Sequence, residues 1–489
     1  MPNGVGVMDA EGVQTGPKAL WFLIWGAMAL FAVVSALAPG WILAGRVGIV
    51  AGIVLAAAAV TQLALGDVRL SKREVTLSGV AVVLFVTGLL TERVLLLPAR
   101  IDFSAYYVAG HVVSENPPGR LYNQLTFPDG RIAPLDSASE WKDVARRHGV
   151  ESVLPFVYTP FFAVLMRPLA YLSYGAAYGV WTAITVMLTL VSVWLGVRLS
   201  GWRVSVELAV ILVVGVFSYH GLFEELLLGQ ADSLLLFLLT LGLWLLQRER
   251  QWGSALCFAV ATIIKITPVI AVPLLVMHRR WKWLAAYGCW MLGLVGFSVW
   301  QAGWAAHAQF LHEVMPSVSC GIATIANLSV VGFVQDLFLG STPANLLQAT
   351  LPPLACAVSK AVALVVFCAV MVRFYFYRRT ESLEVQVVLV ILLSLVISPL
   401  TWLHHYVMAL LPFFYLWGRE REVRKDYLLL ATVLAVGTNI TVFPLPMLFK
   451  GQIGQLMMAG MIPCLTLALV WFRAGGNRGR RFRLTVWHR

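Results

Sequence analysis

Residues 173–197 read SYGAAYGVWTAITVMLTLVSVWLGV, a stretch without a single aspartate, glutamate, lysine or arginine. An α-helix needs about 20 consecutive apolar residues to cross a lipid bilayer. This stretch is long enough, and Arg198 follows it directly. It therefore predicts a transmembrane helix whose carboxyl end lies at a membrane surface.

The rest of the chain has the same apolar character. Hydrophobic residues make up 60% of the 489 residues and charged residues only 12%, whereas soluble domains carry about 25% charged residues. We expect an all-α fold, a polytopic membrane helical bundle with about 12 transmembrane helices. The predicted spans are 18–38, 41–65, 75–97, 173–197, 204–222, 230–247, 283–303, 355–376, 383–400, 402–418, 426–447 and 455–472.

The order of these runs predicts three parts. Residues 1–74 are expected to hold a cytoplasmic N-terminus and an extra helical hairpin. Residues 75–420 form a membrane core with external loops at 98–156 and 304–353. Residues 421–489 add a C-terminal transmembrane hairpin and a basic cytoplasmic tail.

The charge pattern assigns the sides of the membrane. The net charge is +12, but the basic residues fall in short clusters between apolar runs, and residues 305–353 contain no lysine or arginine. By the positive-inside rule, both termini lie in the cytoplasm and the uncharged loop lies outside. A basic face for nucleic acid is not indicated.

One apolar segment, 253–277, has basic clusters at both ends, so it is expected to return to the side from which it enters. Its centre is Lys265-Ile-Thr-Pro268, and proline disfavours a continuous helix. We expect a re-entrant hairpin with Lys265 deep in the membrane. Residues 158–169 are too short and too rich in proline for a span, and predict an amphipathic external helix.

The six cysteines show no Cys-x-x-Cys or other metal-type spacing. We interpret them as small core residues without a redox or metal role. They are Cys257, Cys289, Cys320, Cys356, Cys368 and Cys464.

Ionisable residues beside or within the apolar runs are the candidates for chemistry. Asp102 follows the run at 75–97 directly, Lys265 lies inside a run, and His404 and His405 fall at an external turn. Each also has a structural interpretation: a solvated loop acid, a lysine paired with a carbonyl, and interfacial anchors. At most one of the two histidines is expected to face a site. Glu224 and Glu225 are expected to be solvated.

Six short motifs in order resemble the GT-C superfamily of integral-membrane glycosyltransferases. Within it, the chain is most similar to glycosyltransferase family 87, the polyprenyl-phosphate-mannose-dependent alpha-mannosyltransferases of bacteria, over roughly residues 98–420. The motifs are Asp102-Phe-x-x-Tyr-Tyr107, Tyr158-Thr-Pro-Phe161, Gly229-Gln230, Lys265-x-x-Pro268, Asn327-x-Ser329 and Ser398-Pro-x-x-Trp-x-His-His405.

The resemblance implies an enzyme, a hexosyltransferase that moves a sugar from a polyprenyl-phosphate donor to a lipid or glycan acceptor with inversion. Asp102 is expected to be the general base, with Lys265 and His404 or His405 at the donor phosphate. The expected substrate-binding residues are Tyr106, Tyr107, Tyr158, Gln230 and Asn327. Mannose is the first expectation for the sugar, with arabinose or another sugar left open.

The same resemblance implies a multi-pass protein of the bacterial cytoplasmic membrane, with its active site on the periplasmic side. The expected partners are the donor, the acceptor and membrane lipids, without nucleic acid. No cofactor is expected and no essential divalent metal, because the chain has no Asp-x-Asp motif after the third span. A transporter or lipid flippase is the alternative, although no internal repeat supports it, and a non-enzymatic membrane scaffold is the third.

Overall fold

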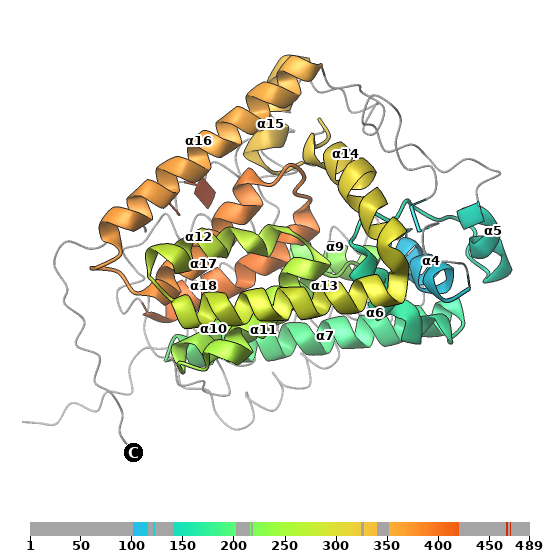
Figure 1. The fold of residues 1–489 in the computed structure, drawn as a ribbon, viewed down its shortest axis with the longest axis horizontal. Helices are drawn as coiled ribbons and strands as arrows, with labels where there is room; N and C mark the ends of the chain where they lie inside the picture. The colour runs from blue at the N-terminus through green and yellow to red at the C-terminus, as the bar shows by residue number, and fades with distance from the viewer. Residues whose placement is uncertain are drawn as a thin grey trace, which may run out of the picture. The chain divides into compact units, whose positions relative to one another are not determined.

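A computed structural model describes residues 101–115, 121–122, 140–201, 216, 219–323, 327–339, 352–419, 466–467 and 470. Within these ranges the regular structure is helical and contains no strand (Figure 1). All of them except Val216 and Tyr219 belong to one compact unit built from residues 98–203 and 220–489. The expected all-α class is confirmed for this part of the chain.

Three helical segments are long and apolar enough to cross a membrane. They are α7 (Tyr174–Leu199), the run Trp281–Ser319 and α16 (Pro353–Tyr377). The middle run consists of α13 (Trp281–Gln309), one turn of π-helix η3 (Phe310–Val314) and α14 (Met315–Ser319). Each matches a predicted span.

Other predicted spans correspond to shorter apolar helices. These are α10 (Asp232–Gln247), α17 (Leu383–Ile397), and the 3-10 helix η5 (Leu403–Ala409) continuing into α18 (Leu410–Arg419). The spans expected at 18–38, 41–65, 75–97 and 426–447 lie outside the described residues, as do most residues of 204–222 and 455–472. The expected number of 12 spans is therefore not confirmed.

The segment expected to form a hairpin is a broken helix that folds back. Helix α11 (Gln251–Ile264) ends at Lys265, whose backbone is extended, and a 3-10 turn η2 (Thr267–Ile270) leads into α12 (Ala271–Met277). The two ends of the segment meet, because Arg280 Nη1 lies 3.1 Å from Glu249 Oε2. The hairpin and its break beside Pro268 thus agree with the sequence.

Helices α4 (Ile101–Glu115) and α6 (Pro160–Ala170) pack closely enough to require a glycine. A Cβ atom on Gly110 would lie 2.9 Å from the backbone oxygen of Met166. Arg167 of α6 then ties both helices to α13, since its Nη2 donates to Val113 O at 2.9 Å and its Nη1 donates to Gln301 Oε1 at 2.5 Å. The helix expected at 158–169 is present as α6, with Phe161, Phe162 and Met166 buried.

Three further short helices complete the described part of the chain, two of them, α5 and α15, in the loops expected to be external. Helix α5 (Glu140–Arg147) buries Trp141, whose indole donates to Leu121 O at 3.1 Å. Helix α9 (His220–Leu228) precedes α10, and α15 (Val330–Leu339) precedes α16.

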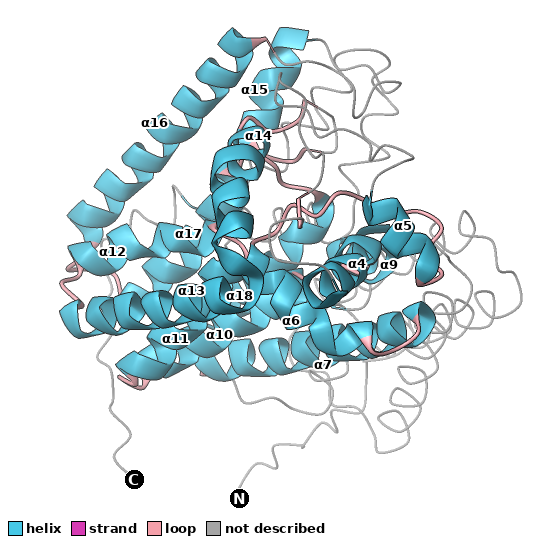
Figure 2. Cartoon of the chain, turned by 45° about the vertical axis from the view of Figure 1, so that its right-hand side comes forward, coloured by secondary structure: helices cyan, strands magenta, loops and turns pink. Residues whose placement is uncertain are grey.

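The interpretation of the cysteines was wrong for two of them. Cys320, at the end of α14, and Cys356, in the first turn of α16, form a disulfide with their Cα atoms 5.5 Å apart. Figures 1 and 2 show the end of α14, α15 and the start of α16 gathered at one end of the unit. A local spacing rule cannot detect this pair because an intervening stretch and α15 separate the two residues. Cys257 is a buried core residue as expected, but Cys289 and Cys368 are exposed, so the expected core position is wrong for these two as well. Cys464 lies outside the described residues.

Candidate active site

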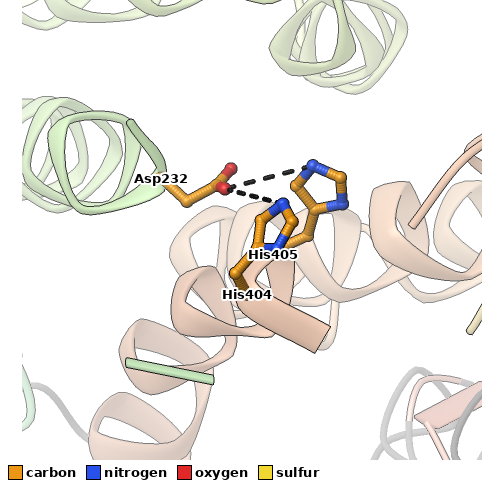
Figure 3. A group of neighbouring side chains, drawn as sticks. All are labelled: Asp232, His404 and His405. Atoms are coloured by element: carbon orange, nitrogen blue, oxygen red, sulfur yellow. Dashed lines mark ion pairs between the residues drawn. The ribbon is translucent and has the colours of Figure 1, made fainter. Parts of the chain in front are cut away.

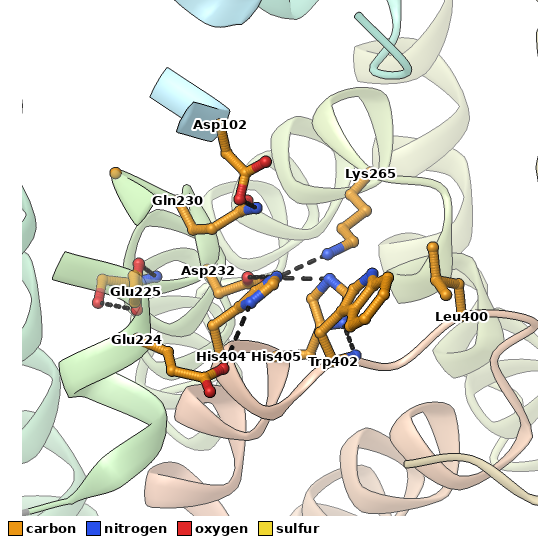
Figure 4. Close-up of polar contacts among 12 residues, drawn as sticks. Asp102, Glu224, Glu225, Gln230, Asp232, Lys265, Leu400, Trp402, His404 and His405 are labelled. Atoms are coloured by element: carbon orange, nitrogen blue, oxygen red, sulfur yellow. Dashed lines mark hydrogen bonds and ion pairs between the residues drawn. The ribbon is translucent and has the colours of Figure 1, made fainter. Parts of the chain in front are cut away.

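Asp102 stands in the first turn of α4 and is held by one side chain. Its Oδ2 accepts a hydrogen bond from Gln230 Nε2 at 2.8 Å (Figure 4). The amide oxygen of Gln230 accepts from Tyr106 Oη at 2.5 Å and from Tyr158 Oη at 3.1 Å. A carboxylate can only accept, so the amide nitrogen of Gln230 faces Asp102 and the amide oxygen is left to accept from the two phenols.

Gln230 reaches Asp102 because the preceding turn lies against α4. Gly229 has φ of 75°, a conformation that favours glycine, and a Cβ atom there would lie 2.6 Å from Phe103 Cβ. The indole of Trp181 donates to the backbone oxygens of both Gly229 and Gln230, at 3.0 and 3.1 Å. The turn at Gly229 and Gln230 therefore places the side-chain amide of Gln230 next to the carboxylate of Asp102.

The carboxylate of Asp102 is suited to accept a proton. Burial raises its pKa, while His404 and the hydrogen bond from Gln230 counteract part of that rise. Its Oδ1 makes no hydrogen bond to any described residue. A carboxylate with a raised pKa and a free oxygen is a good general base.

Lys265 lies beside this network, at the break of the hairpin. Its ammonium donates to Asp232 Oδ1 at 3.0 Å, and the carboxylate of Asp232 is fully buried at the start of α10. The amino end of a helix favours a carboxylate, because the first backbone N–H groups carry partial positive charge. Lys265 is itself one-fifth exposed and uses one of its three ammonium protons on Asp232.

His404 and His405 both face Asp232, which corrects the expectation that at most one histidine faces the site. The Nε2 atom of each imidazole lies 4.0 Å from Asp232 Oδ2, and the ring centroids are 4.4 Å apart (Figure 3). Both are nearly fully buried on η5. Two rotatable bonds in each side chain let adjacent residues turn toward one carboxylate placed between them.

The two histidines differ in their hydrogen bonds. His405 Nδ1 accepts the backbone N–H of Trp402 at 2.8 Å, so the proton of neutral His405 is on Nε2. Neither nitrogen of His404 has a hydrogen-bond partner among the described residues, although its Nδ1 lies 4.0 Å from Glu224 Oε2. His405 is therefore a fixed donor toward Asp232, and His404 has no fixed role.

The sequence predicted no metal-ligand cluster, yet Asp232, His404 and His405 bring potential ligand atoms within 4.8 Å of one another. The residues come from distant segments, so no spacing motif indicates them. The cluster fits a metal poorly. A metal binds a lone pair, and the Nε2 of His405 carries a proton in the tautomer that Trp402 fixes.

Glu225 is not solvated, contrary to expectation. Its carboxylate is fully buried and accepts from the backbone N–H and the hydroxyl of Ser233, at 2.5 and 2.9 Å. Ser233 also shares a hydrogen bond of 2.7 Å with Thr189 of α7. Glu225 therefore anchors the first turn of α10 and, with it, the position of Asp232.

Two of the expected substrate-binding residues are engaged elsewhere. The hydroxyl of Tyr107 donates to Leu172 O at 2.7 Å, and its ring is buried. Asn327 donates to Ile322 O and Pro399 O, and accepts from Ser329 Oγ and the backbone N–H of Thr401. These four bonds use the full capacity of the amide. Asn327 orders the turn before His404 and His405.

Asp232 is the residue at the centre of this cluster that the sequence did not single out. One signal was available in the sequence. Asp232 lies at the edge of one apolar run, and Lys265 lies at the centre of another. Charges in such surroundings are expected to pair.

Comparisons with known proteins identify the family of the chain. Residues 156–399 match the model of Glycosyltransferase family 87. A polyprenol-phosphate-mannose-dependent alpha-(1-2)-phosphatidylinositol pentamannoside mannosyltransferase of Mycobacterium tuberculosis is 28% identical over 260 residues, which cover 52% of this chain and 56% of that protein. The chain thus aligns with a little over half the length of this relative.

Two further relatives extend the likeness. A polyprenol-phosphate-mannose-dependent alpha-(1-2)-phosphatidylinositol mannoside mannosyltransferase of Mycolicibacterium smegmatis is 26% identical over 362 residues, 68% of this chain and 72% of that protein. An alpha-(1->3)-arabinofuranosyltransferase of Mycobacterium tuberculosis is 26% identical over 136 residues, 27% of this chain and 31% of that protein.

The apolar helices and these matches define the class, an integral-membrane glycosyltransferase. The chain belongs to glycosyltransferase family 87, of the GT-C superfamily, as the motifs indicated.

Proposed function

We propose that this enzyme transfers a sugar, in the first instance mannose, from a polyprenyl-phosphate donor to a lipid or glycan acceptor outside the cytoplasmic membrane, with inversion at the anomeric carbon. The observation that carries the proposal is the carboxylate of Asp102, which Gln230 orients and which lies near the polar cluster around Asp232.

The chemistry needs one base. As the acceptor hydroxyl attacks the anomeric carbon, Asp102 takes its proton, and a hydrogen-bonded carboxylate is sufficient for this step. The bond between that carbon and the phosphate oxygen breaks, and its electron pair leaves with the phosphate. A single displacement of this kind inverts the configuration, and the phosphate leaving group needs no second acid.

The departing phosphate gathers negative charge and needs fixed donors. Lys265 has two ammonium protons that no described residue uses, and its position at the helix break leaves it partly exposed. Neither nitrogen of His404 has a hydrogen bond to any described residue, so His404 is the second candidate for the phosphate. Partly burying the charged ammonium of Lys265 costs free energy, and the ion pair with Asp232 offsets this cost before the donor binds.

The sides of the membrane are part of the proposal. The site faces the periplasm, and both termini lie in the cytoplasm of a bacterial cell. The disulfide between Cys320 and Cys356 supports this assignment because disulfides persist in oxidising compartments. Both cysteines lie in or beside the loop at 304–353 that the charge pattern predicts to be external.

The names of the relatives support the choice of substrates. The two mannosyltransferases carry polyprenol-phosphate-mannose and a phosphatidylinositol mannoside or pentamannoside in their names, and the third relative is named as an arabinofuranosyltransferase. For this chain we propose mannose as the sugar and a membrane glycolipid as the acceptor.

Transfer is tested with membranes that contain the chain. Radiolabelled polyprenyl-phosphate mannose and a lipid extract are incubated with these membranes and with membranes that lack the chain. We expect a labelled glycolipid that forms only when the chain is present. Label that crosses the membrane while still attached to polyprenyl phosphate, without a new glycolipid, would indicate a flippase and overturn the proposal.

A further inference from the structure

The cluster formed by Asp232, His404 and His405 contains buried polar atoms that lack partners. Asp232 Oδ2 and both nitrogens of His404 are buried without a hydrogen bond to any described residue. Buried polar groups are nearly always paired. Such atoms side by side therefore indicate a polar group that binds between them.

The hydrogen-bonding character of the cluster is mixed. Asp232 Oδ2 is the acceptor, since Lys265 donates to the other carboxylate oxygen. His405 Nε2 donates, since Trp402 fixes its tautomer. A group between them must donate one hydrogen bond and accept another. A hydroxyl does both.

The distances agree with an oxygen atom. Asp232 Oδ2 lies 4.0 Å from Nε2 of each histidine. An oxygen between them can lie about 2.5–3.0 Å from each, which is the range of hydrogen bonds. Two ligand atoms of a tetrahedral zinc, each about 2.0–2.2 Å from the metal, lie about 3.3–3.5 Å apart, which is closer than the 4.0 Å found here. A bare phosphate oxygen would be repelled by the carboxylate of Asp232.

We infer that this cluster binds a hydroxyl of the donor's sugar, with Asp232 accepting from it and His405 donating to it. The inference rests on the proposed function. Lys265 binds Asp232 Oδ1 and faces the phosphate, so the hydroxyl at Oδ2 belongs to the group attached to that phosphate. The hydroxyl on C2 is the one beside the anomeric carbon, and it is the hydroxyl that we assign to the cluster.

This assignment makes Asp232 and His405 specificity-determining residues. Mannose and glucose differ only in the orientation of the C2 hydroxyl, so a donor and an acceptor fixed on either side of it distinguish the two sugars. A site built to hydrogen-bond a hydroxyl rejects an analogue without it strongly. His404 completes the cluster and can serve as donor or acceptor, since no bond fixes its tautomer.

The test removes the C2 hydroxyl from the donor sugar and the imidazole of His405 from the enzyme, separately and together. The parent and the His405→Leu variant are assayed with prenyl-phosphate mannose and its 2-deoxy analogue. The 2-deoxy sugar also changes the reactivity of the anomeric carbon, so the informative quantity is the ratio of kcat/KM for the two donors in each protein. We expect this ratio to fall at least tenfold in His405→Leu. In His312→Leu, which alters an exposed histidine of η3, it stays unchanged.

Two outcomes of this assay decide whether the cluster binds the C2 hydroxyl. Equal ratios, within threefold, in the parent and His405→Leu overturn the assignment while leaving the proposed transfer intact. If His405→Leu is inactive with both donors, the parent decides alone: among the 2-, 3-, 4- and 6-deoxy donors, the 2-deoxy sugar must lose about 100-fold or more.

Two further outcomes identify other occupants. Activity that a chelator removes and Mn²⁺ or Zn²⁺ restores, together with metal binding lost in His405→Leu, would place a cation in the cluster and overturn the inference. If the parent transfers neither sugar from any prenyl phosphate, the proposed function itself fails. If the parent transfers both sugars equally well, only the assignment of the C2 hydroxyl fails.

Discussion

Gln230 donates to Asp102 at 2.8 Å while its amide oxygen accepts from two tyrosine hydroxyls, so turning the amide around would lose the bond to Asp102 and set two acceptor oxygens against each other. This arrangement makes Gln230 a positioning residue for the base. Burial raises the pKa of both Tyr106 and Tyr158, so the phenols stay protonated and keep donating to Gln230.

Asp102→Asn is expected to abolish transfer while leaving membrane insertion intact, because the amide keeps the shape of the carboxylate but cannot accept the proton. Loss of a positioned base lowers the rate by about 10²–10⁴-fold. Initial rates with saturating donor and acceptor measure the effect. Asp143→Asn is the matched control, since Asp143 is an exposed carboxylate of α5 paired with Arg146. Activity of Asp102→Asn within threefold of the parent would remove Asp102 from the mechanism.

We expect kcat/KM to fall on the acid side of the pH profile, with the midpoint of this acid limb above the usual pKa of a carboxyl group. Burial raises the pKa of Asp102, and the base must be deprotonated to act, so kcat/KM falls as pH drops through this raised value. Gln230→Leu removes a hydrogen bond that lowers the pKa, so the limb should move to still higher pH. Tyr107→Phe alters a phenol outside the network and should leave the limb in place. An unmoved limb in Gln230→Leu would show that Asp102 is not the titrating group.

Lys265→Met is expected to weaken use of the donor, because the thioether side chain retains packing but removes the charge that faces the phosphate. We expect the donor KM to rise or the rate to fall tenfold or more, with acceptor binding little changed. Lys360→Met tests a lysine of another apolar helix, which binds Ser319 at 3.0 Å. Unaltered donor saturation and turnover in Lys265→Met would make Lys265 a structural partner of Asp232.

Both ends of the hairpin are expected in the cytoplasm. Trp252 and Trp281 are exposed, so a cysteine at either position should react with an impermeant maleimide. The background lacks Cys257, Cys289, Cys368 and Cys464 but keeps the disulfide. Labelling should occur only in inside-out vesicles, and Ser152→Cys, in the first external loop, should label only from the opposite side. Labelling of position 252 or 281 from outside the cell would refute the topology.

The disulfide is expected to stabilise the external region. Replacing Cys320 and Cys356 together with serine should lower the free energy of unfolding by about 2–4 kcal/mol, because the crosslink restricts the unfolded chain. Thermal unfolding in detergent measures the change, with Cys368→Ser as the control at an exposed free thiol. Reaction of Cys320 with a thiol reagent in intact, unreduced cells would contradict the pairing.

Sequence patterns predicted the elements that depend on local physics. The uncharged run at 173–197 corresponds to α7, and the helix break appears at Lys265, beside Pro268. Asp102 and Lys265 stood out because a charge beside or within an apolar run is unfavourable without a partner.

What the sequence did not predict depends on contacts between distant segments. Asp232 meets Lys265 and the two histidines only after α10, α11 and η5 have packed together. Asn327 was expected at the substrate, but its amide is saturated by the turn at Pro399 and Thr401. The disulfide joins residues on either side of α15. Neither periodicity nor spacing records such long-range contacts.

The stereochemistry of the product tests the central claim, single displacement with Asp102 as the only base, most directly. Purified enzyme is incubated with prenyl-phosphate mannose of defined anomeric configuration, and the configuration of the new glycosidic bond is determined by nuclear magnetic resonance. We predict a product with the configuration opposite to that of the donor. A product that retains the donor's configuration would require a second nucleophile and a covalent intermediate, and would contradict the mechanism built on Asp102.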